Sequence, residues 1–231
     1  MKKIDNFFHH DKWLSKILKK KTYSILNPSI SMINYPKKID FAYIKVEKNK
    51  KKLLKFFGKE KFKKINSNIT FEKKIKFKKK PLIKIRSANN SDNKKVQVIS
   101  SKNLTDSRFN VDKLIKNKES KLIKKEWVKN FFLKKRGNAL HIIEIKNKIV
   151  GFVLLIFKKN FLIIDLIAID KKFQNKGLGK KLIDYIEFFY FKKYKKIIVG
   201  TQSNNIQSLK FYKKTGFKKI KEDVIFHKHF K

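Results

Sequence analysis

Two short segments combine residue types and spacings suited to binding a phosphate and to moving a proton. The first runs from Gln174 to Lys180 and contains Gly177 and Gly179 ahead of an apolar, helix-like stretch. A glycine turn that opens a helix presents unpaired backbone N–H groups and partial positive charge, which suit a pyrophosphate. Because the chain has only 7 Gly in 231 residues, we expect both glycines to serve backbone geometry that other residues cannot reach. The alternative is an ordinary strand-to-helix turn in which Gly177 only relieves crowding.

The second segment runs from Asn205 to Phe217 and reads as a capped helix that carries Tyr212. Asn205 suits the position before a helix, and Gly216 suits the position after one. A phenol with its ordinary pKa near 10 is protonated at neutral pH and can donate a proton. The alternative is core packing, because Leu209, Tyr212 and Gly216 recur on one helical face.

The spacing of apolar residues predicts an α/β domain with a mixed sheet. Strands are predicted over residues 41–46, 63–71, 82–86, 141–145, 148–158, 161–169 and 196–202, with a final pair of strands over 217–230. Helices are predicted over residues 48–57, 112–132, 177–191 and 205–215. The almost wholly apolar segment 161–169 indicates a central strand. A lysine-rich run before Pro81 suggests a linker, so we expect a small αβ unit over residues 1–80 and a second unit over residues 81–231.

The formal net charge of +44 suggests nucleic-acid binding, but the composition favours another origin. Only three of the 62 basic residues are arginine, and arginine supplies most bidentate and stacking contacts to nucleic acids. Residues with AT-rich codons are abundant and those with GC-rich codons are scarce, as expected of an AT-rich genome. We therefore expect no specific nucleic-acid binding, although nonspecific attraction to polyanions at low salt should remain.

Other features of the composition exclude several classes of protein. The chain has no cysteine, which rules out disulfides and cysteine-ligated metals. No segment approaches the roughly 20 apolar residues of a membrane span, and charged and polar residues interrupt the N-terminus where an export signal would need an apolar core. We therefore expect a cytoplasmic protein.

Together the two segments resemble the motifs of the GCN5-related N-acetyltransferase (GNAT) superfamily. Residues 174–179 are similar to its acetyl-CoA motif Q/R-x-x-G-x-G/A, and residues 205–217 to its motif N-x-x-A/S-x-x-F/L-Y-x-x-x-G-F, at family-like spacing. Residues 82–88 resemble the family's first strand and loop, so the resemblance spans residues 82–231. It implies a GNAT fold with a mixed, splayed central sheet, preceded here by the small αβ unit.

The resemblance also implies roles for individual residues, with acetyl-CoA as co-substrate and no metal. The backbone of Ile167, Ala168 and Ile169 would pair with the pantetheine arm, which Asn205 would also reach, unless Asn205 only caps its helix. Tyr212 would protonate the leaving thiolate of CoA. The pyrophosphate would lie on the amides of Gln174, Asn175, Lys176, Gly177, Leu178, Gly179 and Lys180.

The attacking amine must lose a proton, so a base or a water chain is needed. Asp165 is the first candidate because it is the one charged residue within the apolar strand 161–169, and Glu144 is the second. The alternative for Asp165 is a structural pair with a lysine at a bend of the strand. His227 and His229 share a strand face and could bind a metal, but no third ligand suggests itself, so we expect substrate-side or exposed residues.

The acceptor is narrowed only by a looser resemblance, to amino-sugar N-acetyltransferases of the dTDP-fucosamine type. It rests on Asp106 to Phe109, on Glu126 and Trp127 in the following helix, on Arg136 to Asn138, and on the N-terminal unit. It implies a nucleotide-linked 4-amino-4,6-dideoxyhexose whose phosphate could pair with Arg108, although a structural salt bridge is equally consistent. An N-acetyltransferase of peptide N-termini and a non-enzymatic polyanion-binding protein stay open as alternatives, and a homodimer is one option for the assembly.

Overall fold

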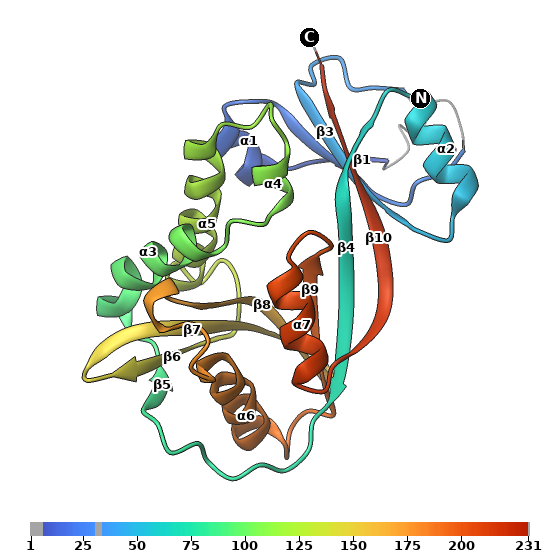
Figure 1. The fold of residues 1–231 in the computed structure, drawn as a ribbon. Helices are drawn as coiled ribbons and strands as arrows, with labels where there is room; N and C mark the ends of the chain where they lie inside the picture. Colours follow the sequence, from blue (N-terminus) through green and yellow to red (C-terminus); the bar gives the residue numbers. More distant parts are fainter. Residues whose placement is uncertain (1–6, 31–33, 231) are drawn as a thin grey trace.

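One mixed sheet of ten strands runs through the part of the chain that the computed structural model describes, residues 7–30 and 34–230 (Figure 1). The spatial order is β1-β2-β3-β10-β4-β9-β8-β7-β6-β5. The strands are β1 (Phe8–His10), β2 (Thr22–Ile25), β3 (Phe41–Glu47), β4 (Lys63–Lys74), β5 (Ile85–Ser87), β6 (Ala139–Ile145), β7 (Lys148–Phe157), β8 (Phe161–Ile169), β9 (Lys196–Gln202) and β10 (Lys218–His229). Within the described residues, the pairs β2–β3 and β8–β9 are parallel and the other pairs are antiparallel. The predicted α/β class with a mixed sheet is confirmed.

Helices cover both faces of this sheet. They are α1 (Lys12–Leu18), α2 (Lys51–Lys59), α3 (Asn93–Asn103), α4 (Arg108–Val111), α5 (Asn117–Phe132), α6 (Leu178–Tyr190) and α7 (Ile206–Lys214), with 3₁₀ turns at Asn90–Asp92 and Lys171–Phe173. Figure 1 shows α3 and α5 on one side of strands β6 to β8 and α6 on the other. Leu182 and Ile186 of α6 pack against one face, whereas Val96 of α3 and Val128 of α5 pack against the opposite face. Helices on both sides bury a continuous core, as the layered class requires.

The C-terminal segment forms one long strand and not the predicted pair of strands. The partners of β10 along β4 pass from Lys219 directly to Lys221, so Ile220 forms a bulge in a continuous strand. A bulge interrupts the alternation of side chains without reversing the chain, which is why the sequence pattern suggested two strands. β10 pairs with both β3 and β4 and so joins the two ends of the sequence in one sheet. Residues 75–84, around the predicted division at residue 80, contain no helix or strand, and the division itself stays a prediction.

The helix predicted over residues 112–132 is shorter than expected and begins at Asn117. Lys116 has extended backbone angles, and its amide donates a hydrogen bond of 2.7 Å to the Glu119 carboxylate, which is typical of a helix start. Asp112 therefore lies in the loop between α4 and α5, where its side chain is free to leave the helix and contact other elements.

Candidate active site

The parallel strands β8 and β9 separate halfway along their length. They pair only where Phe161 to Ile164 meet Lys196 to Val199, and beyond that point β9 pairs with β4 alone. The later part of β8, which includes Ile167, Ala168 and Ile169, pairs only with β7. Its other backbone edge therefore has no strand partner among the described residues. An unpaired edge at the centre of a sheet is a ready acceptor for an extended, amide-containing ligand.

The turn that follows β8 has the backbone geometry that the sequence suggested. Asn175 and Gly177 have φ angles of +61° and +73°, in the left-handed region that Asn tolerates and Gly prefers. A Cβ added to Gly177 would meet no atom within 4 Å, so the alternative in which this glycine relieves crowding is wrong. Gln174 holds the turn against β8 because its side-chain amide donates a hydrogen bond of 2.9 Å to the Ile169 carbonyl.

The N-terminus of α6 is left without a side-chain cap. The amides of Leu178, Gly179 and Lys180 lie in its first turn, where no intrahelical acceptor exists. The helix dipole adds partial positive charge at this point, and the side chain of Lys176 is exposed beside it. Lys180 has its ammonium 2.6 Å from Asp184 on the same helix. The turn therefore offers backbone donors and charge to a bound anion.

Gly179 serves a second purpose, which the sequence did not indicate. A Cβ at this position would lie 3.1 Å from the ring of Phe211 on α7. The glycine thus permits α6 and α7 to approach closely. Leu178, the residue before it, is buried in the core beneath α6 and contributes packing as well as an amide.

Tyr212 lies on α7 and Asn205 caps the start of this helix, which extends beside the separated strands (Figure 1). The Asn205 side-chain oxygen accepts a hydrogen bond of 2.9 Å from the Ser208 amide, so its predicted role as a helix cap is confirmed. Tyr212 is only 3% exposed and packs against Phe71 and Phe217. Its hydroxyl has no hydrogen-bond partner among the described residues, and burial raises its pKa, so the phenol stays protonated at neutral pH. Core packing of the ring and donation by the hydroxyl are compatible.

Asp165 is the extra residue of a bulge in β8 and points toward α5. The partners along β7 pass from Leu166 to Ile164, which leaves Asp165 out of the register. Its carboxylate accepts two hydrogen bonds from Arg136, of 2.6 and 2.7 Å, and one of 3.0 Å from the indole of Trp127. The predicted structural partner was a lysine, and the partner found is an arginine. Because three N–H donors occupy the two carboxylate oxygens, a structural role for Asp165 is favoured over a role as the general base.

Glu144, the second candidate base, lies on β6, two strands away from β8. Its carboxylate contacts Lys84 and Arg86, each at 2.7 Å, and hydrogen bonds from the lysine keep its pKa below the ordinary value. Arg86 also pairs with Asp92 at 2.7 Å. The structure does not bring Glu144 to the separation between β8 and β9, and its contacts are those of an ion-pair network near the sheet edge.

Arg108 has no carboxylate within ion-pair distance among the described residues. Its guanidinium lies 3.9 Å from the ring centre of Tyr43 and 4.5 Å from that of Phe109. Its NH1 nitrogen is buried without a hydrogen-bond partner. The ammonium of the buried Lys124 lies 4.9 Å from the ring centre of Trp127, and burial lowers its pKa to about 8. The structural salt bridge that was the alternative for Arg108 is not found among the described residues, and both cations lie against aromatic rings without a carboxylate in contact.

A group of amide side chains continues along β4 and β9 beyond the separation. Asn68 lies opposite Gln202 in the register, and their side chains are 3.4 Å apart. Both amide atoms of Asn66 and the carbonyl oxygen of Gln202 are buried without a partner in the described structure. Sequence reasoning did not find this group, because no local pattern marks polar residues on neighbouring strands that are far apart in the chain.

His227 also differs from the expectation of an exposed residue. It is 1% exposed, and both it and His229 contact Asp112, which the sequence reasoning placed inside a helix. Burial lowers the pKa of His227 to about 4.

No described helix is long and apolar enough to cross a membrane.

The sequence was compared with protein-family models and with curated proteins. Residues 105–217 match the model of the acetyltransferase (GNAT) family, a match that includes both motif segments. No curated protein matches the sequence. Over residues 105–217 the chain is therefore similar to the GNAT acetyltransferases, a family that uses acetyl-CoA as co-substrate.

Solved structures share the fold at low sequence identity. A functionally unknown conserved protein from Staphylococcus epidermidis is 12% identical, with a TM-score of 0.67 over 94% of this chain and 88% of that one. A GCN5-related N-acetyltransferase from Sphaerobacter thermophilus is 10% identical, with a TM-score of 0.58 over 82% of this chain and 59% of that one. A glucosamine N-acetyltransferase region of a fungal multi-domain β-N-acetylglucosaminidase is 11% identical, with a TM-score of 0.58 over 82% of this chain and 25% of that one.

Proposed function

We propose that this chain is a GNAT-type acetyltransferase that transfers the acetyl group of acetyl-CoA to the amine of a nucleotide-linked amino sugar of the 4-amino-4,6-dideoxyhexose type. One observation carries the assignment of the acetyl-CoA site. The unpaired edge of β8 is followed, after the 3₁₀ turn Lys171–Phe173, by the left-handed turn at Asn175 and Gly177 and then by the uncapped start of α6. An extended pantetheine arm followed by a pyrophosphate has the same order of groups: amides first, then anionic oxygens.

In this proposal Ile167, Ala168 and Ile169 pair with the pantetheine amides through their backbone. Asn205, whose oxygen is engaged in capping α7, has its side-chain NH₂ left to donate to the same arm. The amides from Gln174 to Lys180 bind the pyrophosphate.

The reaction is a direct attack of the amine nitrogen on the acetyl carbonyl carbon. The C–N bond forms, the C–S bond breaks, and the CoA sulfur leaves as a thiolate. Tyr212 donates its proton to that sulfur, and burial favours this role because it keeps the phenol protonated before the step. The amine loses its own proton to water. Asp165, whose oxygens are occupied by Arg136 and Trp127, holds α5 against β8.

The acceptor assignment is supported by the polar groups on the far side of the separation. The amides of Asn66, Asn68 and Gln202 suit the hydroxyls of a sugar, because each amide can both donate and accept. Arg108 and Lys124 suit the phosphates of a nucleotide. The fungal region with the same fold acetylates glucosamine by its description, so this architecture accommodates an amino sugar in another protein.

The test is an acetyl-CoA thiol-release assay with the wild-type chain and the Tyr212→Phe variant. The panel contains dTDP- and UDP-linked 4-amino sugars, free amino sugars and peptides with a free N-terminus. We expect turnover with a nucleotide-linked sugar and a loss of about 10²-fold or more in kcat in the variant. Tyr194→Phe is the matched control, because Tyr194 is buried in the same core and makes no hydrogen bond through its hydroxyl among the described residues.

Each other result would contradict a different part of the proposal. Turnover with peptides alone would keep the acetyl-CoA site and overturn the sugar acceptor. Equal kcat for Tyr212→Phe and wild type would overturn the role of Tyr212 as general acid. Failure to bind acetyl-CoA, measured by calorimetry, would overturn the whole assignment.

A further inference from the structure

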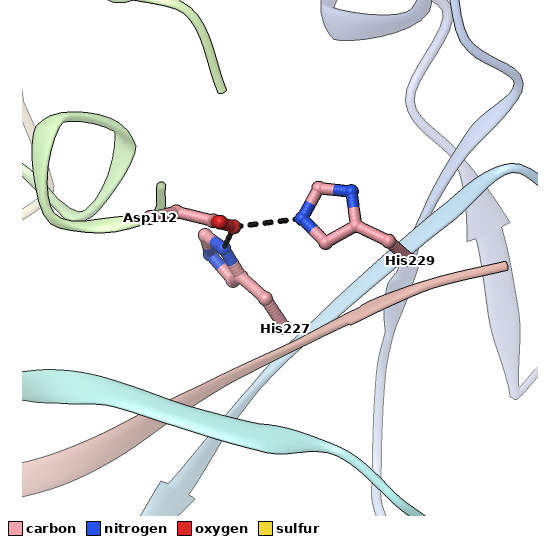
Figure 2. Close-up of side chains that lie close together, drawn as sticks. All are labelled: Asp112, His227 and His229. Carbon is pink, nitrogen blue, oxygen red and sulfur yellow. Dashed lines mark hydrogen bonds and ion pairs between the residues drawn. The ribbon is translucent and has the colours of Figure 1, made fainter. Parts of the chain in front are cut away.

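Asp112, His227 and His229 form a compact cluster outside the acetyl-CoA site (Figure 2). Oδ2 of Asp112 lies 2.6 Å from Nδ1 of His227 and 2.8 Å from Nε2 of His229. One oxygen and two imidazole nitrogens thus converge, each offered by a different residue, with all three atoms within 4.8 Å of one another. Carboxylate oxygen and imidazole nitrogen are the ligands that zinc and similar divalent ions take in proteins that lack cysteine.

The elements that carry these side chains hold them in place. His227 and His229 are two residues apart on β10, so they share one face of the strand. The ring of Phe41 packs against both imidazoles, with centroid distances of 4.9 and 4.7 Å. The other carboxylate oxygen of Asp112 accepts a hydrogen bond of 3.0 Å from the Leu114 amide, which directs Oδ2 toward the imidazoles. The arrangement is therefore built by the loop and the strand together.

The carboxylate of Asp112 has no described lysine or arginine in direct contact, although the charge of Arg108 acts on the cluster from farther away. Asp112 is 4% exposed, yet within the described parts of the chain it forms no ion pair with a lysine or arginine. A buried carboxylate favours a compensating positive charge, and its side-chain partners here are the two imidazoles. Each imidazole, moreover, has its second nitrogen buried with no protein partner: Nε2 in His227 and Nδ1 in His229. Two imidazoles and one carboxylate are a complete set of protein ligands for a three-residue site with an open fourth position.

We propose that Asp112, His227 and His229 bind one divalent transition-metal ion, with zinc as the best match to the ligand types. Ligands about 2.1 Å from a tetrahedral ion lie about 3.4 Å apart, so small side-chain rotations suffice to admit it. A surface pocket of about 560 Å³ adjoins the cluster at Asp112, and its other lining residues include Lys102, Lys113 and Lys121. The ion would join the loop between α4 and α5 to β10, which is more than 100 residues away in sequence. With water as its fourth ligand, the ion would connect the loop to the strand, independent of the acetyl-transfer proposal.

The experiment uses the untagged full-length chain, freed of metal by chelation. Co²⁺ and Zn²⁺ are titrated, with visible absorption reporting Co²⁺ ligation and equilibrium dialysis giving the stoichiometry. We expect one ion per chain and a higher thermal midpoint with Zn²⁺. His229→Gln keeps a hydrogen-bond donor for Asp112 and removes one ligand, so its affinity should fall by at least about tenfold, the lower end of the loss caused by changing even an indirect partner of a ligand.

The control removes the adjacent pair His9 and His10 on β1, the other place where two imidazoles lie together in the sequence. The His9→Gln, His10→Gln variant should bind metal as the wild type does. Three results would overturn the proposal. The first is equal zinc affinity in His229→Gln and the wild type, and the second is loss of binding in the control variant. The third is no binding at about 1 mM Zn²⁺, the weak end of specific metal sites. If His229→Gln does not fold, X-ray absorption of the zinc-loaded wild type replaces it: two imidazole ligands support the site, and fewer than two refute it.

Discussion

Arg136 donates two hydrogen bonds to Asp165, from Nε to Oδ2 at 2.6 Å and from NH2 to Oδ1 at 2.7 Å. The arginine comes from the segment after α5, and the aspartate is the bulged residue of β8. Trp127 lies beneath the guanidinium, 4.7 Å from its carbon to the ring centre, and donates to the same carboxylate. A bidentate pair that also stacks on an aromatic ring is a rigid connection between a helix and a strand.

This connection predicts that Asp165→Asn lowers stability more than it lowers chemistry. Removing one partner leaves a part-buried guanidinium without its counter-charge, so we expect a loss of roughly 1–3 kcal/mol in the free energy of unfolding. The value of kcat should fall by less than about tenfold, well below the 10²–10⁴-fold loss typical of a catalytic base. Arg136→Gln should lower the free energy of unfolding by a similar amount. The double variant should lower it little further, because each single change already removes the same interaction. A loss of 10²-fold or more in kcat, with the basic limb of the pH profile changed, would instead identify Asp165 as the base.

Gly177 is predicted to be required for its backbone angle alone. Its φ of +73° strains any residue with a Cβ, and the space around it is open. Gly177→Ala should therefore lower the free energy of unfolding by about 1–2 kcal/mol and raise the Kd for acetyl-CoA. Asn175→Gly is the control, since glycine accepts the φ of +61° found there and the Kd should change little. Denaturant unfolding and calorimetry measure the two effects, and an unaltered Gly177→Ala protein would show that the turn adapts.

Gly179 is predicted to be required for packing. The ring of Phe211 lies 3.1 Å from the position of an added Cβ, so Gly179→Ala should push α6 and α7 apart and lower the thermal midpoint. The change Phe211→Leu removes the obstructing edge of the ring. We expect the double variant to regain part of the lost midpoint, measured by calorimetric scanning. A strictly additive double variant would mean that the two residues do not interfere.

Arg108 is predicted to recognise the phosphate of the acceptor. Arg108→Gln should raise KM for a nucleotide-linked amino sugar by about tenfold or more, because hydrogen bonds to charged groups contribute about 1.5–3 kcal/mol. The KM for the corresponding free amino sugar is the internal control and should change little. If both values of KM rise together, Arg108 supports the fold around Tyr43 and does not contact phosphate.

His141 is predicted to make the protein less stable in acid. Burial lowers its pKa from 6.5 to about 4, and its Nε2 lies 2.8 Å from the Tyr190 hydroxyl. Between these pH values the unfolded chain binds a proton that the folded chain does not, so stability falls as the pH falls from 6.5 to 4, by about 3 kcal/mol in total from this residue. His141→Gln should remove that part of the slope, measured by urea unfolding across the range. An unchanged slope would assign the acid sensitivity to other groups.

The sequence by itself determined the elements whose signals are local. The bounds of β8 and β9 agree with the prediction residue for residue, and α7 lies between the predicted cap Asn205 and Thr215. The turn before α6 was also predictable. Periodicity, caps and left-handed turns depend on interactions within a few residues of one another, which a single sequence displays. The proposed acetyl-CoA side of the candidate site rests on these local signals.

Tertiary structure alone decided which strands are neighbours and which distant side chains are in contact. It inserted β10 between β3 and β4, and it made residues 218–229 one strand with a bulge at Ile220 where the sequence suggested a pair of strands. It also gave Asp165 an arginine partner and brought Asp112 to His227 across 115 positions of the chain. Partners so distant are chosen by strand order and by burial of both faces of the sheet. No local pattern in the sequence encodes those choices, because they depend on the packing of the whole chain.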